Sequence, residues 1–521
     1  MYYNTTTVGF FDAMGQKQVD YILNQTEMCT ILCSSQYLPK IIDMKKVGLA
    51  GMVKNLVMMD DVPQEQIQAA SEYNIQVYSM KDVILSGEKE QKVKYIEPAP
   101  EDYYIFSYTS GTTGDSKGVK LSHRNILVNS LATLDRLPAN PGDTAISYLP
   151  MTHSFEQANL GAVLVKQLAM GFYQGDPLKL TEDCQMLKPV FFPSVPRLYN
   201  RIYGKLTSTF ADATGCKKWL IDKAVNSKLH YLKQNGAVTH GCYDKLVFGK
   251  TAAVLGGQVR LMVTGSAPID KTVLEFLKIA FCCPVLEGYG LTESSAGSCI
   301  TDAADTVSGH VGGPTEYVKF RLKDLPEMDY RIDDKPYPRG ECQMIGPSIF
   351  DGYFKRPDKT AECIDEEGWF STGDVVVVYP NGALKIVDRS KNIFKLSQGE
   401  YIAPEKIENV FVLSPFVGMS LVYGNSLKNN VVAVVYPDPA AARAWAAKNG
   451  GESNFETICK DENFKKEVMA DLIALATKNK LSSLEKPKDI FITSEEFTIE
   501  NELLTPTFKL KRNVAAKVFE E

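Results

Sequence analysis

A loop rich in glycine and hydroxyl residues does most to limit what this chain can fold into. It reads YTSGTTGDSKGV over residues 108–119 and follows an apolar, aromatic run at 104–109 that is typical of a strand. Glycine lets the backbone approach an anion, hydroxyl and N–H groups donate to its oxygens, and a lysine adds positive charge. A flexible surface loop would need neither the strand nor the lysine, and the residue order fails the Walker A pattern. The residues predicted to contact phosphate are Thr109, Ser110, Gly111, Thr112, Thr113, Gly114 and Lys117.

The composition indicates a folded protein with more than one domain. The chain has 521 residues, of which 44% are apolar and 23% charged, and this length exceeds what one core usually holds. A net charge of −6 and a pI of about 5.7 exclude a broad basic face for nucleic acid. The eleven cysteines are scattered without a C-x-x-C pair, which favours reduced thiols over a metal site.

Strand and helix signals alternate along most of the chain, which predicts an α/β fold. A Pro-Asn-Gly turn after residue 379 predicts a hairpin. The charged stretch that follows residues 388–389 is the best candidate for a domain boundary. Strands are expected over residues 104–109, 259–263, 374–379 and 384–387, and an amphipathic helix over 464–476.

Further segments carry side chains suited to chemistry. They read LPMTHSFE (149–156), GSAP (265–268), GYGLTES (288–294), GWFSTGD (368–374), DR (388–389), RSKNIFKLSQGEYIAPEKIE (389–408) and LTPTFKLKR (504–512). An aromatic ring such as Tyr289 offers a flat face to a base, and a carboxylate such as Asp374 accepts from two vicinal hydroxyls. Taken alone, a single histidine such as His153 is more often structural, and core packing is the alternative role of Tyr289.

In this order the segments resemble the core motifs of adenylate-forming enzymes, and nearly the whole chain resembles the eukaryotic-type, AMP-forming long-chain fatty acyl-CoA synthetases. The resemblance implies a ligase that makes acyl-AMP and pyrophosphate from ATP and a fatty acid, then acyl-CoA and AMP from coenzyme A. It implies a large N-terminal adenylation domain of layered β-sheets and helices over residues 1–388. A small, mobile α+β domain is expected over 389–521.

The resemblance also implies residue roles. His153 falls near the substrate carboxylate, Thr292 at the α-phosphate and Lys509 in the catalytic position of adenylate formation, while Lys395 is associated with the thioester step. Mg²⁺ is expected at Glu293 and Thr109. The further positions implied for nucleotide, hinge and coenzyme A are Gly265, Ser266, Ala267, Tyr289, Gly290, Asp374, Arg389, Lys391 (the hinge) and Gly399 (beside coenzyme A).

The chain departs from its family in two places. Phe508 stands where a glycine usually precedes the lysine, and residues 12–33 resemble a segment that lies well inside the family's N-terminal domain. We therefore expect an incomplete first domain with exposed apolar surface. Two alternatives stay open: a related ligase for another carboxylic acid, and a truncated, non-catalytic acyl-binding homologue.

The expected partners are a long-chain fatty acid, ATP and coenzyme A, with no nucleic acid. The first residues lack the basic and apolar regions of a signal peptide, and no apolar run is long enough for a transmembrane helix. We expect the protein in the cytoplasm or on the cytoplasmic side of membranes, such as the endoplasmic reticulum, through peripheral association.

Overall fold

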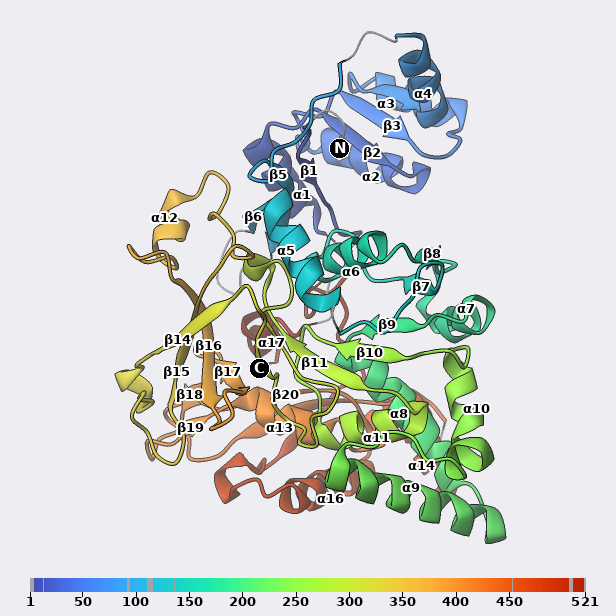
Figure 1. Cartoon of the computed structure of the whole chain (residues 1–521), viewed down its shortest axis with the longest axis vertical. Coiled ribbons are helices and arrows are strands. Elements are labelled where there is room, and N and C mark those ends of the chain that lie inside the picture. Colours follow the sequence, from blue (N-terminus) through green and yellow to red (C-terminus); the bar gives the residue numbers. More distant parts are fainter. Residues whose placement is uncertain are drawn as a thin grey trace. The chain divides into compact units, whose positions relative to one another are not determined.

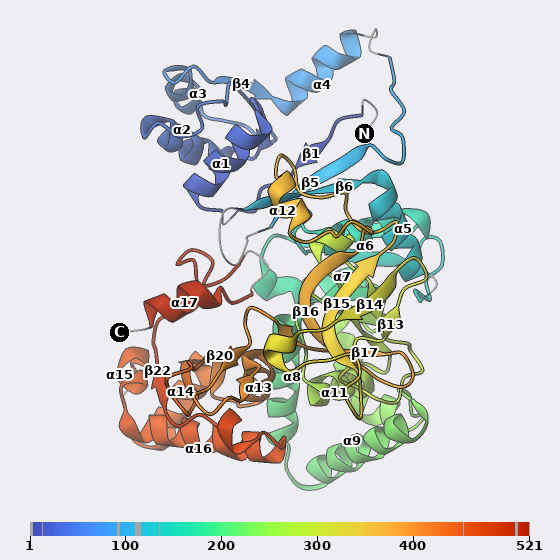
Figure 2. The ribbon, with the colours of Figure 1, turned by 90° about the vertical axis from the view of Figure 1, so that its left-hand side faces the viewer.

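The computed structural model describes residues 4–12, 14–90, 94–109, 116–134, 136–451, 453–505 and 509–519. The chain divides into two compact units, which are Met1–His123 with Tyr353–Pro357 and Arg124–Gly352 with Asp358–Glu521 (Figures 1 and 2). The predicted boundary after residue 388 falls inside the second unit and stays a prediction.

The first unit holds two small sheets, with strand orders β2-β3-β4 and β1-β5-β6. Strands β2, β3 and β4 are parallel, and Leu23, Leu38 and Leu56 are buried in the cluster that joins them to the helices. The elements are β1 Thr7–Val8, α1 Gln16–Thr26, β2 Thr30–Cys33, α2 Leu38–Lys46, β3 Asn55–Met58, α3 Gln64–Ser71, β4 Gln76–Ser79, α4 Met80–Lys89, β5 Tyr103–Thr109 and β6 Lys117–Ser122. Strand β5 confirms the strand predicted over 104–109.

A seven-stranded sheet organises the second unit in the order β13-β12-β11-β10-β9-β7-β8. The strands β8, β7, β9, β10 and β11 pair in parallel, and β12 and β13 pair antiparallel at one edge. The elements are α5 His123–Leu134, β7 Thr144–Ser147, α6 Ser154–Val165, β8 Ala169–Phe172, α7 Leu180–Leu187, β9 Phe191–Ser194, α8 Pro196–Ala211, α9 Gly215–Asn235, α10 Gly249–Ala252, β10 Leu261–Thr264, α11 Lys271–Phe281, β11 Val285–Tyr289, β12 Cys299–Ile300 and β13 Gly313–Pro314.

Strand β10 begins two residues later than the range 259–263 predicted. The ladder to β9 starts at the pair Leu261 and Phe191. The preceding Arg260 N–H donates to the Val190 carbonyl at 2.8 Å, and its side-chain Nη1 lies 2.8 Å from Asp143 Oδ2. The apolar pattern therefore locates the strand but not its first residue.

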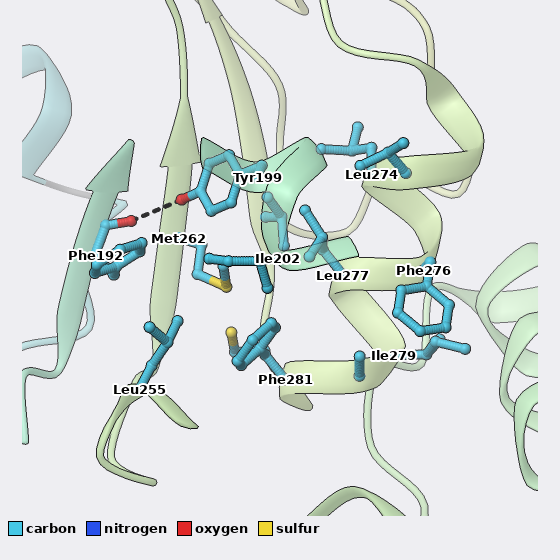
Figure 3. Close-up of a cluster of buried hydrophobic side chains, with 14 of the residues drawn as sticks. Phe192, Tyr199, Ile202, Leu255, Met262, Leu274, Phe276, Leu277, Ile279 and Phe281 are labelled. Atoms are coloured by element: carbon cyan, nitrogen blue, oxygen red, sulfur yellow. Dashed lines mark hydrogen bonds between the residues drawn. The ribbon is translucent and has the colours of Figure 1, made fainter. Parts of the chain in front are cut away.

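The core of this sheet lies under α8 and α11. Phe192, Met262 and Val285 occupy one register row across β9, β10 and β11 and are buried. Figure 3 shows Tyr199 above this row, with its hydroxyl directed at the Phe192 carbonyl. The Tyr199 hydroxyl lies 2.9 Å from Phe192 O and 3.2 Å from Val263 O, so its polar end is satisfied inside an apolar core.

One charged side chain, Lys228 of α9, is buried at the edge of this core. Its Nζ lies 2.5 Å from Asp244 Oδ1, 2.7 Å from the Ile279 carbonyl and 3.2 Å from Cys282 Sγ. An ammonium has three N–H donors, so all of them have acceptors. Burial acts to raise the pKa of Asp244, but hydrogen bonds from Lys228 and a backbone N–H, with the charge of Lys228, hold it below its usual value.

A four-stranded antiparallel sheet follows, in the order β14-β15-β16-β17. The predicted hairpin is confirmed, because β16 and β17 pair across the Pro-Asn-Gly turn and align Asp374 with Arg389. The elements are β14 Lys319–Lys323, β15 Arg339–Ile345, α12 Pro357–Ala361, β16 Phe370–Val378 and β17 Leu384–Arg389.

The remaining residues build a sheet β20-β21-β22 and a short hairpin β18-β19. The helix predicted over 464–476 is confirmed as α16, whose Phe464, Val468, Leu472 and Ala476 are buried. The elements are β18 Phe394–Lys395, β19 Tyr401–Ile402, α13 Pro404–Phe411, β20 Val417–Tyr423, β21 Val432–Pro437, α14 Pro439–Lys448, α15 Phe455–Cys459, α16 Glu462–Lys478, β22 Ile490–Ile492 and α17 Arg512–Val518.

Two further observations concern the thiols and the helices. The eleven cysteines are all free. Across the described ranges, no helix has both the length and the apolar character that crossing a membrane requires.

The buried ion pair of Lys228 generates a stability prediction. Asp244→Ala is expected to lower the free energy of unfolding by about 3–5 kcal/mol, because it leaves a buried ammonium without its counterion. Lys228→Met should cost less, since it removes that charge and Asp244 keeps some access to water. Urea denaturation measures both. Asp222→Ala is the matched control: it breaks the exposed pair with Lys218 and should cost less than about 0.5 kcal/mol. Equal losses from the two aspartate variants would contradict the account.

Candidate active site

A buried carboxylate, Asp374 of β16, lies between two predicted nucleotide-binding residues. The Tyr289 hydroxyl donates to Asp374 Oδ2 at 2.6 Å, and Arg389 Nε lies 3.4 Å from Asp374 Oδ1. Burial raises the pKa of Asp374, and the positive charge of Arg389 opposes that rise. The hairpin register places Arg389 beside Asp374, and the end of β11 supplies Tyr289. The Asp374 carboxylate is therefore flanked by a cation and an aromatic ring.

The turns after β10 and β11 lie side by side at the carboxyl edge of the parallel sheet. Thr264 is paired with Glu287, so the turn formed by Gly265, Ser266 and Ala267 begins beside the last residues of β11. Ligands of parallel sheets bind at this edge. Tyr289 ends β11, and the predicted residues Gly290, Thr292 and Glu293 follow it on the second turn.

Close backbone contact explains why position 290 is glycine. A Cβ at Gly290 would lie 1.4 Å from the carbonyl oxygen of Ala296, so any side chain would displace the loop. The loop is held further by Leu291 N–H, which donates to Ser294 Oγ at 3.0 Å. The Phe350 N–H donates to the Glu293 carbonyl at 2.9 Å. Thr292 and Glu293 thus sit on a rigid turn.

His153 lies between β7 and α6, where it caps the helix. Its Nδ1 accepts a hydrogen bond from Phe155 N–H at 3.1 Å, which leaves Nε2 to carry the proton of the neutral ring. Burial, and then the positive charge of Lys509, lowers the pKa of His153 to about 4. The imidazole is therefore neutral near pH 7 and can donate through Nε2.

Lys509 is brought to the same place from the far end of the chain. Its backbone N–H donates to Thr505 Oγ1 at 3.0 Å, and its carbonyl accepts from Thr505 N–H at 2.7 Å. Burial lowers the pKa of Lys509, and so does the charge of Arg389. The carboxylates of Glu405, Asp374 and Glu293 act in the opposite direction. The side chain is therefore within electrostatic range of the nucleotide-binding residues and His153.

The residues predicted for the thioester step form a separate hairpin. Lys395 ends β18, and its Nζ lies 5.0 Å from the Tyr401 ring centroid. Gly399 has φ +96°, a left-handed conformation that favours glycine, and its added Cβ would lie 3.9 Å from Lys395 Cε. Lys391 is exposed in the segment between β17 and β18. Lys395 and Gly399 are close together, and their roles stay predictions.

The predicted phosphate loop belongs to the first unit, and only its ends are described. Thr109 of β5 pairs with Lys117 of β6, so the strand expected before the loop is paired with a second strand that follows the loop. Lys117 Nζ lies 4.7 Å from the Tyr353 ring centroid. Ser110, Gly111, Thr112, Thr113 and Gly114 lie outside the described residues.

Several buried charged groups near the site were not predicted as functional. Asp388, treated only as a boundary, accepts from Arg389 N–H at 2.7 Å, from Asn392 Nδ2 at 3.1 Å and from Glu405 N–H at 3.1 Å. Burial raises its pKa to about 7, and the negative charge of Glu405 contributes to that rise. The Pro-Glu start of α13 after the DR segment is a helix-start signal and could have suggested the contact.

Glu156 is a second such group, on the first turn of α6. Ser147 Oγ donates to its Oε1 at 2.5 Å and Asn159 Nδ2 to its Oε2 at 3.2 Å. Burial raises its pKa to about 7. It lies one turn beyond His153, inside the segment LPMTHSFE, and ties the start of α6 to β7.

Comparison with known proteins agrees with this geometry. Residues 1–354 match the family described as AMP-binding enzyme. The chain is 40% identical over 520 residues to the peroxisomal long chain acyl-CoA synthetase 7 of Arabidopsis thaliana, covering 100% of this chain and 74% of that protein. It is 40% identical over 523 residues to long-chain-fatty-acid–CoA ligase 5 of Rattus norvegicus, covering 99% and 76%.

A solved structure gives the same fold. The adenylation domain of a carboxylate reductase from Mycobacterium chelonae is similar with a TM-score of 0.79 and 25% identity, over 99% of this chain and 75% of that one. This confirms the expected mixed α/β adenylation fold. The chain therefore belongs to the AMP-binding enzyme family, in its branch of long-chain acyl-CoA synthetases.

Proposed function

We propose that this chain is an AMP-forming long-chain fatty acid–CoA ligase. It makes acyl-AMP and pyrophosphate from ATP and a fatty acid, and then acyl-CoA and AMP from coenzyme A. The observation that carries the proposal is the contact of Asp374 with Tyr289 and Arg389, with Lys509 close enough to lower the pKa of His153. These groups come from distant parts of the chain and combine a carboxylate, an aromatic ring and two cations. The two relatives described above are named as a long chain acyl-CoA synthetase and a long-chain-fatty-acid–CoA ligase.

Adenylate formation needs positioning and charge neutralisation rather than a covalent nucleophile. A carboxylate oxygen of the fatty acid attacks the α-phosphorus, and pyrophosphate leaves. In the proposal Asp374 accepts from the ribose hydroxyls, Tyr289 packs against adenine and Thr292 donates to the α-phosphate. His153 donates to the substrate carboxylate, and Lys509 neutralises charge that develops on the phosphates.

Mg²⁺ is part of the proposal. This ion is usually held by one or two carboxylates, with phosphate oxygens and water completing its shell. Within the ranges that the structure describes, no group of three or more His, Cys, Asp or Glu side chains could hold a metal. Glu293 is proposed to supply a carboxylate, and the nucleotide and water would supply further oxygens. The expectation for Thr109, which belongs to the first unit, stays a prediction. When bound, the ion would neutralise charge on the pyrophosphate that leaves.

The second step is assigned to the β18-β19 hairpin. Coenzyme A sulfur attacks the acyl carbonyl, and AMP leaves. We propose that residues 389–521 move as a small domain about Lys391, which withdraws Lys509 and presents Lys395 and Gly399. The two lysines lie on different structural elements, which supports this proposal. Lys509 lies just before α17 and is bonded to Thr505, whereas Lys395 lies on the β18-β19 hairpin.

The cellular setting is also proposed. A long acyl chain partitions into bilayers, so we propose that the protein acts in the cytoplasm or on the cytoplasmic side of a membrane such as the endoplasmic reticulum, through peripheral association. The relative from Arabidopsis thaliana is named peroxisomal, which is consistent with an organelle setting.

The reaction itself is the first test. The purified protein with ATP, Mg²⁺, coenzyme A and palmitic acid should give palmitoyl-CoA, AMP and pyrophosphate, measured by chromatography and a pyrophosphate assay. Formation of ADP and phosphate would contradict the AMP-forming assignment. Acetate and an aromatic acid are the control substrates, and faster turnover of either would favour a ligase for another carboxylic acid.

The two lysines should separate the two steps. Lys509→Ala is expected to slow acyl-adenylate formation by roughly 100- to 1,000-fold, because a preorganised charge at the reacting phosphate is lost. Conversion of supplied acyl-adenylate to acyl-CoA should be largely retained. Lys395→Ala should show the reverse pattern. Single-turnover assays of each half-reaction measure this, and equal loss of both steps in both variants would refute the two-conformation mechanism.

The pKa shifts predict how adenylate formation depends on pH. The charged form of Lys509 is the active one and its pKa is lowered, so the rate should fall as pH rises, starting below the usual lysine value of about 10.4. His153, with a pKa of about 4, stays neutral, so the pH–rate profile should show no change in slope near pH 6.5. Lys509→Arg keeps its charge and should lose the alkaline limb. A limb that persists unchanged in this variant would rule out Lys509 as its source.

A further inference from the structure

Arg512, three residues after Lys509, forms a largely buried ion pair with Glu408. Arg512 donates from Nη1 to Glu408 Oε1 at 2.7 Å and from Nη2 to Glu408 Oε2 at 2.5 Å. The two side chains are only 14% and 13% exposed. Glu408 Oε1 also accepts from Val422 N–H at 2.7 Å. The guanidinium is thereby fixed by two parallel bonds to α13, and α13 is bound in turn to β20.

The chain between Lys509 and Arg512 has little freedom. Lys511 N–H donates to the Leu503 carbonyl at 2.8 Å, and Leu504 pairs with Leu510 in an antiparallel bridge. Leu503 and Leu504 are buried in one cluster with Ala515 of α17. A displacement of the start of α17 would therefore move the arm that carries Lys509.

Arg512 also balances carboxylates that face it from two other elements. Burial raises the pKa of Asp388, and Glu405 adds to the rise, while the charge of Arg512 counters it. The charges of Glu408, Glu405 and Asp388 in turn hold the pKa of Arg512 above its usual value, although burial acts against this. Removal of Arg512 would leave three neighbouring carboxylates without their common cation, a costly arrangement away from water.

We propose that Arg512, through its pair with Glu408, is a positioning residue that holds Lys509 within reach of the phosphates during adenylate formation. The inference rests on the proposed role of Lys509. Glu408 and Arg512 both lie in residues 389–521, so the pair would travel intact with that domain. Lys395 stands on the β18-β19 hairpin, and the thioester step should not need the pair.

The test compares the two half-reactions in three variants. Arg512→Gln and Glu408→Gln should each slow acyl-adenylate formation by roughly 10- to 100-fold, because a small displacement of a catalytic group has effects of this size. Conversion of supplied acyl-adenylate to acyl-CoA should stay near the wild-type rate. Arg512→Lys keeps the charge but cannot form two parallel bonds, so its adenylation rate should lie between those of Arg512→Gln and the wild type.

Two controls make the outcome decisive. Arg443→Gln removes an exposed arginine of α14 and should leave both steps unchanged. Lys509→Ala in the same assay tests the proposed function by itself: unchanged adenylation there would remove the premise. If Lys509→Ala is impaired while the Arg512 and Glu408 variants keep wild-type adenylation, the positioning role is overturned. Equal loss of both half-reactions in these variants would also overturn it, because that is the pattern of general structural damage.

Discussion

The pairing of Asp374 with Arg389 is the interaction on which the candidate site depends. A carboxylate that is 4% exposed is costly unless it is paired, and here the partner is supplied by the opposite strand of the same hairpin. Arg389 is the last residue of β17, so the pair lies where the chain leaves the four-stranded sheet for the β18-β19 hairpin. Tyr289 completes the arrangement from the seven-stranded sheet, so one acceptor joins two sheets at the site.

The sequence pattern was sufficient to predict elements that are determined by neighbouring residues. The helix α16 could be predicted because its apolar residues repeat at helical spacing, and the β16-β17 hairpin because its turn residues permit only a tight reversal. Position 261 as the start of β10 could not, since it depends on the backbone ladder to β9, whose residues are far away in the sequence. Lys228 shows the same limit, because a lysine within a helix usually faces water.

The candidate site divides in the same way. Tyr289, Asp374 and Lys509 could be chosen from motifs that resemble a family, and the fold brings them together. Glu405, Glu408 and Arg512 belonged to those same segments, yet nothing local distinguishes them from surface charges. Their importance comes from burial and from bonds between α13 and the start of α17, which only the folded chain defines. The site is thus a set of recognisable groups held by contacts that single-sequence patterns do not reveal.

The capping of α6 by His153 has a consequence for how a donor is prepared. Capping occupies Nδ1, so the tautomer of the ring is settled when the helix forms and does not depend on what enters the site. A carboxylate that arrives would meet an N–H already oriented, with no proton to relocate and little solvent to rearrange. The entropic cost of ordering this side chain is therefore met during folding and not during substrate binding. The hydrogen bond from Phe155 N–H that caps α6 also determines which imidazole nitrogen carries the proton.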